Sequence, residues 1–209
     1  MPLPLYQRAQ FVHGSIYHIF NRCVKGQLLF YSAENYRYFL DQLHKYMSDL
    51  MHIYCWSLLP NHFHLLSAVK EESECRFNEK EKRILEQDPA LLTDLISMRF
   101  KNFFLSHSMA IKNENDINTN VFAQKFKHIR VDKDPYLAML VYYIHFNPAK
   151  HGVTADWQNY RWSSYQKIIN GDFSISDVST VLEWFGGLEN FIKYHQVQWS
   201  GFDCGFCDE

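Results

Sequence analysis

The chain has 209 residues, of which 47% are hydrophobic and 21% charged. These values are typical of one globular domain with a buried core, and they exclude a low-complexity chain. The net charge of −2 lacks the basic excess of many nucleic-acid-binding proteins. The charge is uneven, however. Glu71–Glu86 is acidic, whereas Lys125–Lys133 and Lys150–Arg161 are basic, which leaves room for a local basic face.

The location of the protein is predicted from what the sequence lacks. The first residues contain no apolar run of the signal-peptide kind. No segment reaches the roughly 18 consecutive apolar residues that a bilayer crossing needs. We therefore expect a cytoplasmic protein with no membrane partner. Cys23, Cys55 and Cys75 are scattered and fit reduced thiols. Cys204 and Cys207 form a single C-x-x-C pair near the C-terminus, without the second pair that a zinc site would need.

The first half of the chain alternates between strand and helix patterns. Strand-forming residues, in part with period-two alternation, predict three strands, at Ser15–Asn21, Ile53–Leu59 and His62–Val69. Apolar residues at helical spacing predict a helix over Ala33–Met51, with Ser32 as its N-cap. A turn at Pro60-Asn61 would make the second and third strands a hairpin.

The second half is richer in helix. A strand is predicted at Phe122–Val131, and a helix is predicted from Pro135 to about Asn147, where Pro148 is expected to end it. A further helix is predicted at Pro89–Lys112, and helical or loop segments are predicted at Trp162–Asn170 and Asp177–His195. The acidic stretch Glu71–Asp88 fits an exposed loop or a short helix.

This order of elements predicts an α+β fold. The sequence β-α-β-β-α-β is that of a ferredoxin-like split β-α-β domain with an antiparallel sheet. Its helices pack on one face of the sheet, and extra helices follow at the C-terminal end. The other face would then be open to carry a site. We expect one domain over residues 1–209, with 176–209 as a C-terminal helical extension or tail.

A His-x-His sequence begins the third predicted strand. Alternate side chains of a strand share one face, so His62 and His64 would lie side by side while Phe63 enters the core. Neutral imidazoles are good ligands for divalent transition metals. The simpler interpretation, two hydrogen-bonded or exposed histidines at the start of a strand, stays open.

Tyr143 and Asn147 are four residues apart on the helix that starts at Pro135. They therefore share one side of that helix, at the edge of its apolar stripe. A helix lying on the sheet would present the phenol and the amide oxygen towards the two histidines. Each residue also has an ordinary alternative, a boundary aromatic for Tyr143 and a capping residue before proline for Asn147.

Together these groups match the needs of phosphodiester chemistry. A tyrosine oxygen can attack phosphorus and hold the chain end covalently, which splits one difficult step into two. A metal ion polarises the phosphate and absorbs developing charge. Two histidines and the Asn147 oxygen form a mixed nitrogen and oxygen ligand set, which suits Mn²⁺ and tolerates Mg²⁺.

Several motifs resemble those of a known family. LLPNHFHLL, followed by YYIHFNPAKHGV, is similar to the single-tyrosine transposases of the HUH class, in which U is a hydrophobic residue. The closer resemblance is to the REP-associated tyrosine transposases, with further matches in HIFNRCVKGQLLF, VFAQKFKHIRV and WQNYRWSSY. The resemblance covers roughly Ser15 to Tyr165, and it combines residue type with order and spacing.

The resemblance implies roles for particular residues. It places metal-binding histidines at His62 and His64, the nucleophile at Tyr143, and a polar residue that completes the metal site at Asn147. Tyr142 is the rival nucleophile, expected to point about 100° away around the helix, towards solvent or a partner. The implied activity is transposase or endonuclease cleavage and transfer of single-stranded or hairpin DNA through a 5′-phosphotyrosine, by a monomer or a homodimer.

Basic residues near these motifs are candidates for contacts with DNA phosphates. Ordinary solvated charge is the alternative for each of them singly. They are Arg22, Lys125, Lys127, Arg130, Lys150 and Arg161.

Two rival functions remain open. The chain could be a non-catalytic nucleic-acid-binding module on the same scaffold, although the aromatic RNP signature of RNA-recognition modules is missing. It could also be a metal-dependent phosphodiesterase that uses activated water and does not need Tyr143. Replacing Tyr143 by phenylalanine separates the second rival from the transposase hypothesis.

Overall fold

The fold is described from a computed structural model, which covers residues 9–123, 125–131 and 134–197, without the side chains of 134–136. Its centre is a four-stranded antiparallel sheet of order β2-β3-β1-β4. The strands are β1 (Ile16–Arg22), β2 (Met51–Leu59), β3 (His62–Val69) and β4 (Lys127–Val131). This order places β1 and β3 in the middle, as a ferredoxin-like fold requires, and the predicted α+β class is confirmed.

Seven α-helices accompany the sheet in the described part of the chain. They are α1 (Ala33–Met47), α2 (Glu79–Gln87), α3 (Leu92–Asn115), α4 (Asp134–Lys150), α5 (Tyr165–Ile169), α6 (Val178–Phe185) and α7 (Leu188–Gln196). Single 3₁₀ turns lie at Glu72–Glu74, Pro89–Leu91 and Trp157–Asn159. None of the described helices combines the length and apolar character that a bilayer crossing needs.

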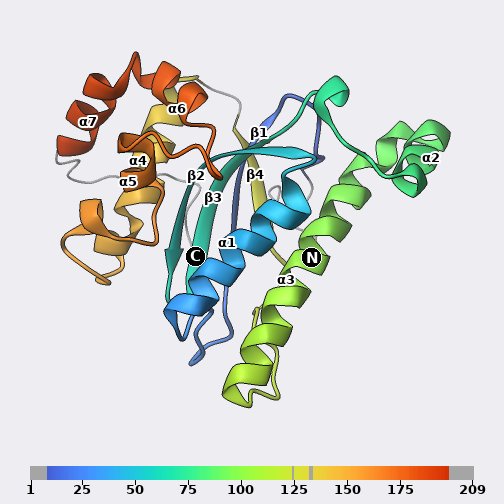
Figure 1. Cartoon of the computed structure of the whole chain (residues 1–209), viewed down its shortest axis with the longest axis horizontal. Helices are drawn as coiled ribbons and strands as arrows, with labels where there is room; N and C mark the ends of the chain where they lie inside the picture. Colours follow the sequence, from blue (N-terminus) through green and yellow to red (C-terminus); the bar gives the residue numbers. More distant parts are fainter. Residues whose placement is uncertain (1–8, 124, 132–133, 198–209) are drawn as a thin grey trace, which may run out of the picture.

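One face of the sheet is covered by α1 and α3, which pack against each other (Figure 1). Ser32 caps α1 through a reciprocal capping box with Asn35, as the sequence predicted for the cap. The layer between these helices and the sheet is aromatic. Phe39 lies 5.1 Å from Phe63 of β3 and 4.7 Å from Phe103 of α3, between ring centroids. This face holds the larger apolar core.

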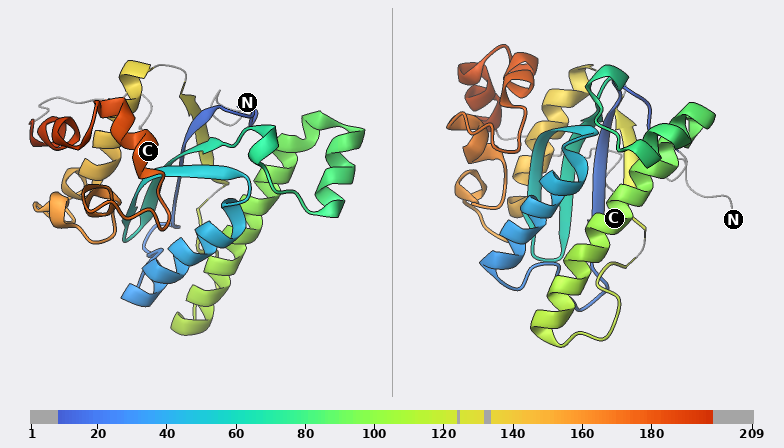
Figure 2. Two further views of the ribbon diagram at one scale, coloured as in Figure 1. Left: turned by 45° about the horizontal axis from the view of Figure 1, so that its top comes forward. Right: turned by 45° about the vertical axis from the view of Figure 1, so that its right-hand side comes forward.

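The opposite face of the sheet is not open, contrary to the expectation from the sequence. Helix α4 lies across β2 and β3, with α5 to α7 gathered around it (Figure 2). Val141 and Ile144 of α4 pack with Leu66 of β3 in a second, smaller core. The apolar stripe of α4 therefore buries itself on the strands, so a site on this face must lie beneath or beside that helix.

Several element boundaries differ from the predicted ones. Helix α1 ends at Met47 and Met51 starts β2, whereas one helix was predicted over Ala33–Met51, and the pattern at Asp177–His195 forms two helices, α6 and α7. Strand β4 starts only at Lys127, and Phe122 contributes an isolated bridge with Cys23 instead of extending the strand. Helix α4 continues through Pro148 to Lys150. Proline lacks one N–H donor, but the last turn carries on, and His151 N still donates to Asn147 O at 3.0 Å. The helix thereby reaches one turn further than expected.

The acidic stretch forms a short 3₁₀ turn and helix α2, which is held to the domain by an ion pair. Arg99 of α3 donates two hydrogen bonds to the Glu81 carboxylate, at 2.9 and 2.7 Å. Such a forked pair is a strong charge-assisted contact. The segment is thus docked on α3, and its other acidic residues are mostly exposed.

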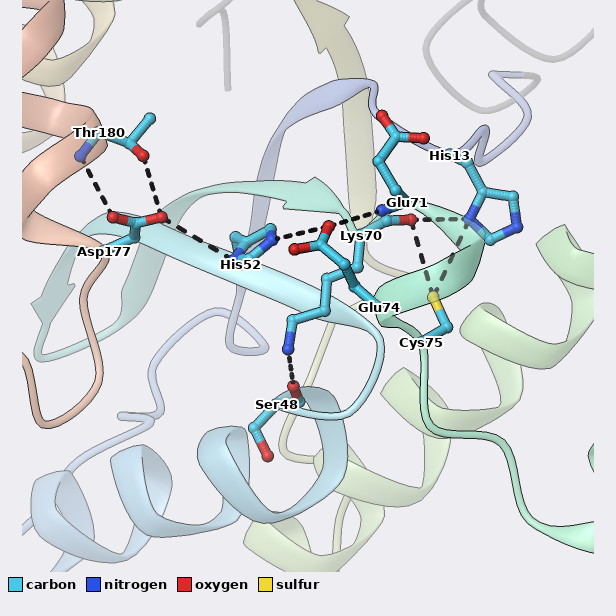
Figure 3. Close-up of polar contacts among 9 residues, drawn as sticks. All are labelled: His13, Ser48, His52, Lys70, Glu71, Glu74, Cys75, Asp177 and Thr180. Carbon is cyan, nitrogen blue, oxygen red and sulfur yellow. Dashed lines mark hydrogen bonds and ion pairs between the residues drawn. The ribbon is translucent and has the colours of Figure 1, made fainter.

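A polar cluster fastens the end of the sheet where β2 starts and β3 stops (Figure 3). His52 Nε2 lies 3.5 Å from a Glu74 carboxylate oxygen, and His52 Nδ1 lies 3.9 Å from Asp177. Asp177 also caps α6 by accepting from the Thr180 backbone at 3.2 Å. Lys70 donates to the Ser48 carbonyl at 2.8 Å. These contacts join α6 to β2 at the end of the strands away from the His-x-His pair.

Candidate active site

His62 and His64 lie side by side at the start of β3, on the face that α4 covers. Their ring centroids are 5.3 Å apart and the ring planes are nearly perpendicular. Phe63 points the other way, into the aromatic layer. The alternation of the strand thus puts two imidazoles on one side and a large apolar ring on the other. Both histidines are buried, with 4% and 1% of their surface exposed.

Each of the two histidines has a neighbour at its Nδ1 atom. His62 Nδ1 lies 2.7 Å from the side-chain oxygen of Asn61, in the turn before β3. His64 Nδ1 lies 2.9 Å from Nε2 of His18, which comes from β1. Hydrogen bonds at Nδ1 orient the rings and leave Nε2 as the atom that can bind a ligand.

Tyr143 faces this pair from α4 of the same chain. Its ring centroid is 5.7 Å from that of His64 and 6.4 Å from that of His18, edge-on to both. Lys150, two turns further along α4, places its ammonium 4.7 Å from the centre of the Tyr143 ring. The same ammonium donates to the phenol oxygen at 3.3 Å. The Tyr143 phenol therefore lies close to both the Lys150 ammonium and the imidazoles of His64 and His18.

Asn147 completes the inner side of the site. Its Nδ2 donates to the Tyr143 carbonyl at 2.9 Å, and the residue is fully buried. Its side-chain oxygen has no hydrogen-bond partner within the usual distance among the described residues. The ring of His151 lies 4.5 Å from that of His62, between centroids. Asn147 thus places a buried oxygen in the immediate surroundings of the histidines, and its side chain interacts with His62.

Burial keeps the site histidines neutral. It lowers the pKa of His62 to about 3, an effect to which His151 adds and which the Asn147 side chain opposes. Burial likewise lowers the pKa of His18 to about 3 and that of His64 well below its usual range. Neutral imidazoles keep a nitrogen lone pair, which is the form that binds a metal ion.

The surface beside the histidines is hollowed and basic. One hollow is lined by residues that include Phe20, Arg22, His64 and Lys127, and an adjoining one by Arg22 and Lys25, with His62 lining both. Of the basic residues selected from the sequence, Arg22 and Lys127 therefore border the site, and Lys150 contacts Tyr143. An anionic ligand in these hollows would meet positive charge next to the imidazoles.

The other selected basic residues lie elsewhere. Arg130 pairs in register with Tyr17, whose ring belongs to the α1 and α3 core, so it is directed to the opposite face of the sheet. The Arg161 guanidinium lies 4.4 Å above the Trp162 ring and lines a different hollow. Lys125 is exposed in the segment before β4.

Tyr142, the rival nucleophile, was expected to point to solvent or a partner, but it is buried within the chain. It is 3% exposed, and its ring packs with Phe146 at 5.5 Å and with His195 of α7 at 5.6 Å between centroids. The C-terminal helices occupy the side of α4 that the sequence analysis left open. Tyr142 is thus separated from the histidine pair by the rotation of one residue around α4.

His18 and His151 were not among the site residues predicted from the sequence. The alternation of β1 already put His18 on the face opposite Tyr17 and Ile19, but the pairing of β1 with β3 was needed to bring it to His64. His151 was missed because the helix was expected to end before Pro148, whereas α4 continues to Lys150 and His151 N still donates to Asn147 O.

The residues present fit a divalent cation. No group of three or more His, Cys, Asp and Glu side chains forms a metal site within the described residues. The expected set is of another kind, because it combines His62 and His64 with the buried oxygen of Asn147. Neutral rings held at Nδ1, together with that oxygen, provide the mixed nitrogen and oxygen donors that Mn²⁺ accepts.

Comparison with known proteins agrees with the architecture. No protein-family model matches the chain. No curated protein matches it either. A solved structure, a REP-associated tyrosine transposase bound to a REP hairpin, matches with a TM-score of 0.54 and 16% identity. The match covers 96% of this chain and 98% of that one. This chain therefore shares the fold of a REP-associated tyrosine transposase.

Proposed function

We propose that this protein cleaves and rejoins single-stranded DNA through a covalent bond between DNA and Tyr143. The observation that carries the proposal is the contact between Tyr143 and His64, 5.7 Å between ring centroids within one chain. The resemblance of the motifs to single-tyrosine transposases supports the same conclusion. So does the shared fold with a tyrosine transposase whose structure holds a DNA hairpin.

In the first step, the Tyr143 oxygen attacks the phosphorus of a DNA phosphodiester. A bond forms between the phenol oxygen and phosphorus, the bond from phosphorus to the 3′ oxygen breaks, and the product is a 5′-phosphotyrosine with a free 3′-hydroxyl. The phenol proton leaves, and the departing 3′ oxygen gains one. The Lys150 ammonium, 3.3 Å from the phenol oxygen, stabilises the negative charge that develops there.

A divalent cation, Mn²⁺ or Mg²⁺, would be held by His62, His64 and Asn147. When bound, it supplies Lewis acid chemistry, polarising the phosphate. Arg22 and Lys127 border the hollow next to the histidines and would hold the DNA backbone. In the second step, a 3′-hydroxyl attacks the phosphotyrosine, the strands are joined, and the phenol is restored. Each step exchanges one phosphodiester for another, so no external energy source is needed.

A non-catalytic nucleic-acid-binding module is the second candidate, because Tyr143 is only 1% exposed. An attack on phosphorus requires the DNA to reach this phenol through the hollow beside His62 and His64. A module that only binds DNA would have no such requirement.

The test combines labelled hairpin DNA with the protein and Mn²⁺, followed by denaturing electrophoresis. We expect a covalent adduct with the natural protein and with Tyr142→Phe, which serves as the matched control. No adduct is expected with Tyr143→Phe or in EDTA. An adduct with Tyr143→Phe would contradict the assignment. DNA affinity that is unchanged by EDTA, without cleavage by any variant, would support the binding module. Cleavage that persists in Tyr143→Phe without an adduct would support a water-dependent phosphodiesterase.

A further inference from the structure

His18 and His64 form a buried pair that joins the two central strands. His18 Nε2 lies 2.9 Å from His64 Nδ1, and the rings are nearly parallel, with planes at 18° and centroids 5.2 Å apart. Each residue is only 1% exposed. The strand pairing sets this contact, because Phe20 is opposite His64 and His18 is its neighbour on the same face of β1. The distance identifies a hydrogen bond, with one proton between two nitrogens.

The proton can belong to either ring, and the ability of His64 to bind a cation depends on which ring carries it. If His18 donates, His64 Nδ1 is the acceptor, and the proton of the neutral His64 ring sits on Nε2. If His64 donates from Nδ1, its Nε2 carries a lone pair. Only the second arrangement allows His64 to bind a cation through Nε2.

His62 is held differently. Its Nδ1 lies 2.7 Å from the side-chain oxygen of Asn61, and an amide oxygen can only accept. The proton of His62 is therefore on Nδ1, and its Nε2 carries the lone pair that a cation would use. The partner of His64 at Nδ1 is an imidazole, which can donate as well as accept, so this contact alone does not fix the tautomer of His64.

We propose that His18 is a positioning residue for cation binding, which accepts a hydrogen bond from His64 Nδ1 and so stabilises the form of His64 that binds through Nε2. The inference rests on the proposed function, in which His64 is a metal ligand. When the cation is bound, the His18 proton must sit on its own Nδ1. That atom is buried and has no hydrogen-bond partner among the described residues. Cation binding thus selects one of two proton arrangements of the pair.

The test measures Mn²⁺ affinity of the full chain by electron paramagnetic resonance of free Mn²⁺. His18→Phe keeps a ring but removes the acceptor, and we expect it to weaken binding by roughly 10- to 100-fold, the usual effect of losing such a supporting contact. His18→Gln retains an acceptor and should stay within about threefold of the natural protein. His107→Phe is the matched control. His107 is a buried histidine of α3 that contacts the Leu29 carbonyl, and its loss should leave Mn²⁺ affinity unchanged.

A second measurement needs no variant. Nitrogen-15 NMR of the histidine rings, with Zn²⁺ as a diamagnetic probe, reports which nitrogen of each ring carries the proton. We expect protons on Nδ1 of both His64 and His18 in the Zn²⁺-bound natural protein. A proton on His18 Nε2, or unchanged Mn²⁺ affinity in a folded His18→Phe variant, would overturn the inference and leave the metal site intact. Failure of the natural protein to bind Mn²⁺ and Zn²⁺ would overturn the proposed metal site, and the inference with it.

Discussion

The two faces of the sheet differ in composition, although neighbouring residues of the same strand, β3, line both of them. On the α1 and α3 face, Phe63 joins a close-packed aromatic layer. On the α4 face, His62 and His64 meet Tyr143, and the packing leaves a buried oxygen and a basic hollow. A single strand therefore contributes to stability with one set of alternate residues and to the candidate site with the other.

The largest effects should come from substituting neighbours on opposite faces. Phe63→Ala removes a large ring from a packed layer, and we expect it to lower the free energy of unfolding by about 3–5 kcal/mol. His64→Ala removes a proposed ligand, and we expect cleavage to fall on the order of 1,000-fold, since Lewis acid stabilisation is worth several kcal/mol. Urea denaturation and single-turnover cleavage measure the two effects. Similar losses of activity in both folded variants would contradict the division between the faces.

Buried histidines outside the candidate site, on both sides of the sheet, should make the stability of the fold depend on pH. Burial lowers the pKa of His107 on α3 and of His195 on α7 to about 4, and that of His145 on α4 well below its usual range. Above about pH 6.5, these rings are neutral in the folded and unfolded chain alike. Below that pH, these histidines become protonated in the unfolded chain, whereas in the folded chain His107 and His195 stay neutral until the pH approaches 4.

The free energy of unfolding should therefore fall as the pH drops below about 6.5. The expected slope is up to about 1.4 kcal/mol per pH unit for each such histidine. Urea denaturation between pH 7.5 and 4.5 measures the slope, and His107→Phe should reduce it by the share of one ring. A stability that stays constant over this range would show that these histidines are not buried as described.

A smaller effect is expected for Lys150→Met, which removes the ammonium beside the Tyr143 oxygen. A hydrogen bond to a charged group is worth about 1.5–3 kcal/mol, and Lys150 is exposed, so the lower end applies. The rate of adduct formation at saturating DNA should fall about tenfold. Lys150→Arg should recover part of it. Lys127→Met, at the hollow beside the histidines, should weaken DNA affinity and leave the rate at saturating DNA unchanged. A loss of rate with Lys127→Met and a loss of affinity with Lys150→Met would contradict these two roles.

The smallest effect is expected at Arg161, which lies above Trp162 in a hollow away from the histidines. Arg161→Ala should change DNA affinity less than about twofold, whereas Arg22→Ala should weaken it several-fold and reduce its dependence on salt. Fluorescence anisotropy with labelled hairpin DNA at two salt concentrations measures both variants. A larger loss with Arg161→Ala would move the DNA-binding surface to the side of α5.

The fold and the centre of the site were predictable because they follow local rules. Period-two alternation puts His62 and His64 on one face, and a four-residue spacing puts Tyr143 and Asn147 on one side of a helix. The supporting contacts depend on which strands and helices meet. His18 reaches His64 only through the pairing of β1 with β3. Tyr142 is buried only because α7 packs on α4, a contact between distant segments.

The covering of the second sheet face was the main error, and its cause is also physical. The apolar stripe of α4 required a partner surface, and a helix lying on the sheet was expected, but the sequence alone did not say that α4 would cover β2 and β3. Pro148 was expected to stop α4, yet a proline in the last turn costs only one backbone hydrogen bond. The tail pair Cys204 and Cys207 lies outside the described residues.

The covalent bond between DNA and Tyr143 is tested most directly by identifying the residue to which the DNA becomes attached. The natural chain is incubated with a DNA hairpin and Mn²⁺, digested with protease and nuclease, and the modified peptide is sequenced by mass spectrometry. We expect a nucleotide attached through phosphate to Tyr143. A nucleotide on Tyr142 or any other residue would contradict it, as would DNA cleavage that leaves no tyrosine modified.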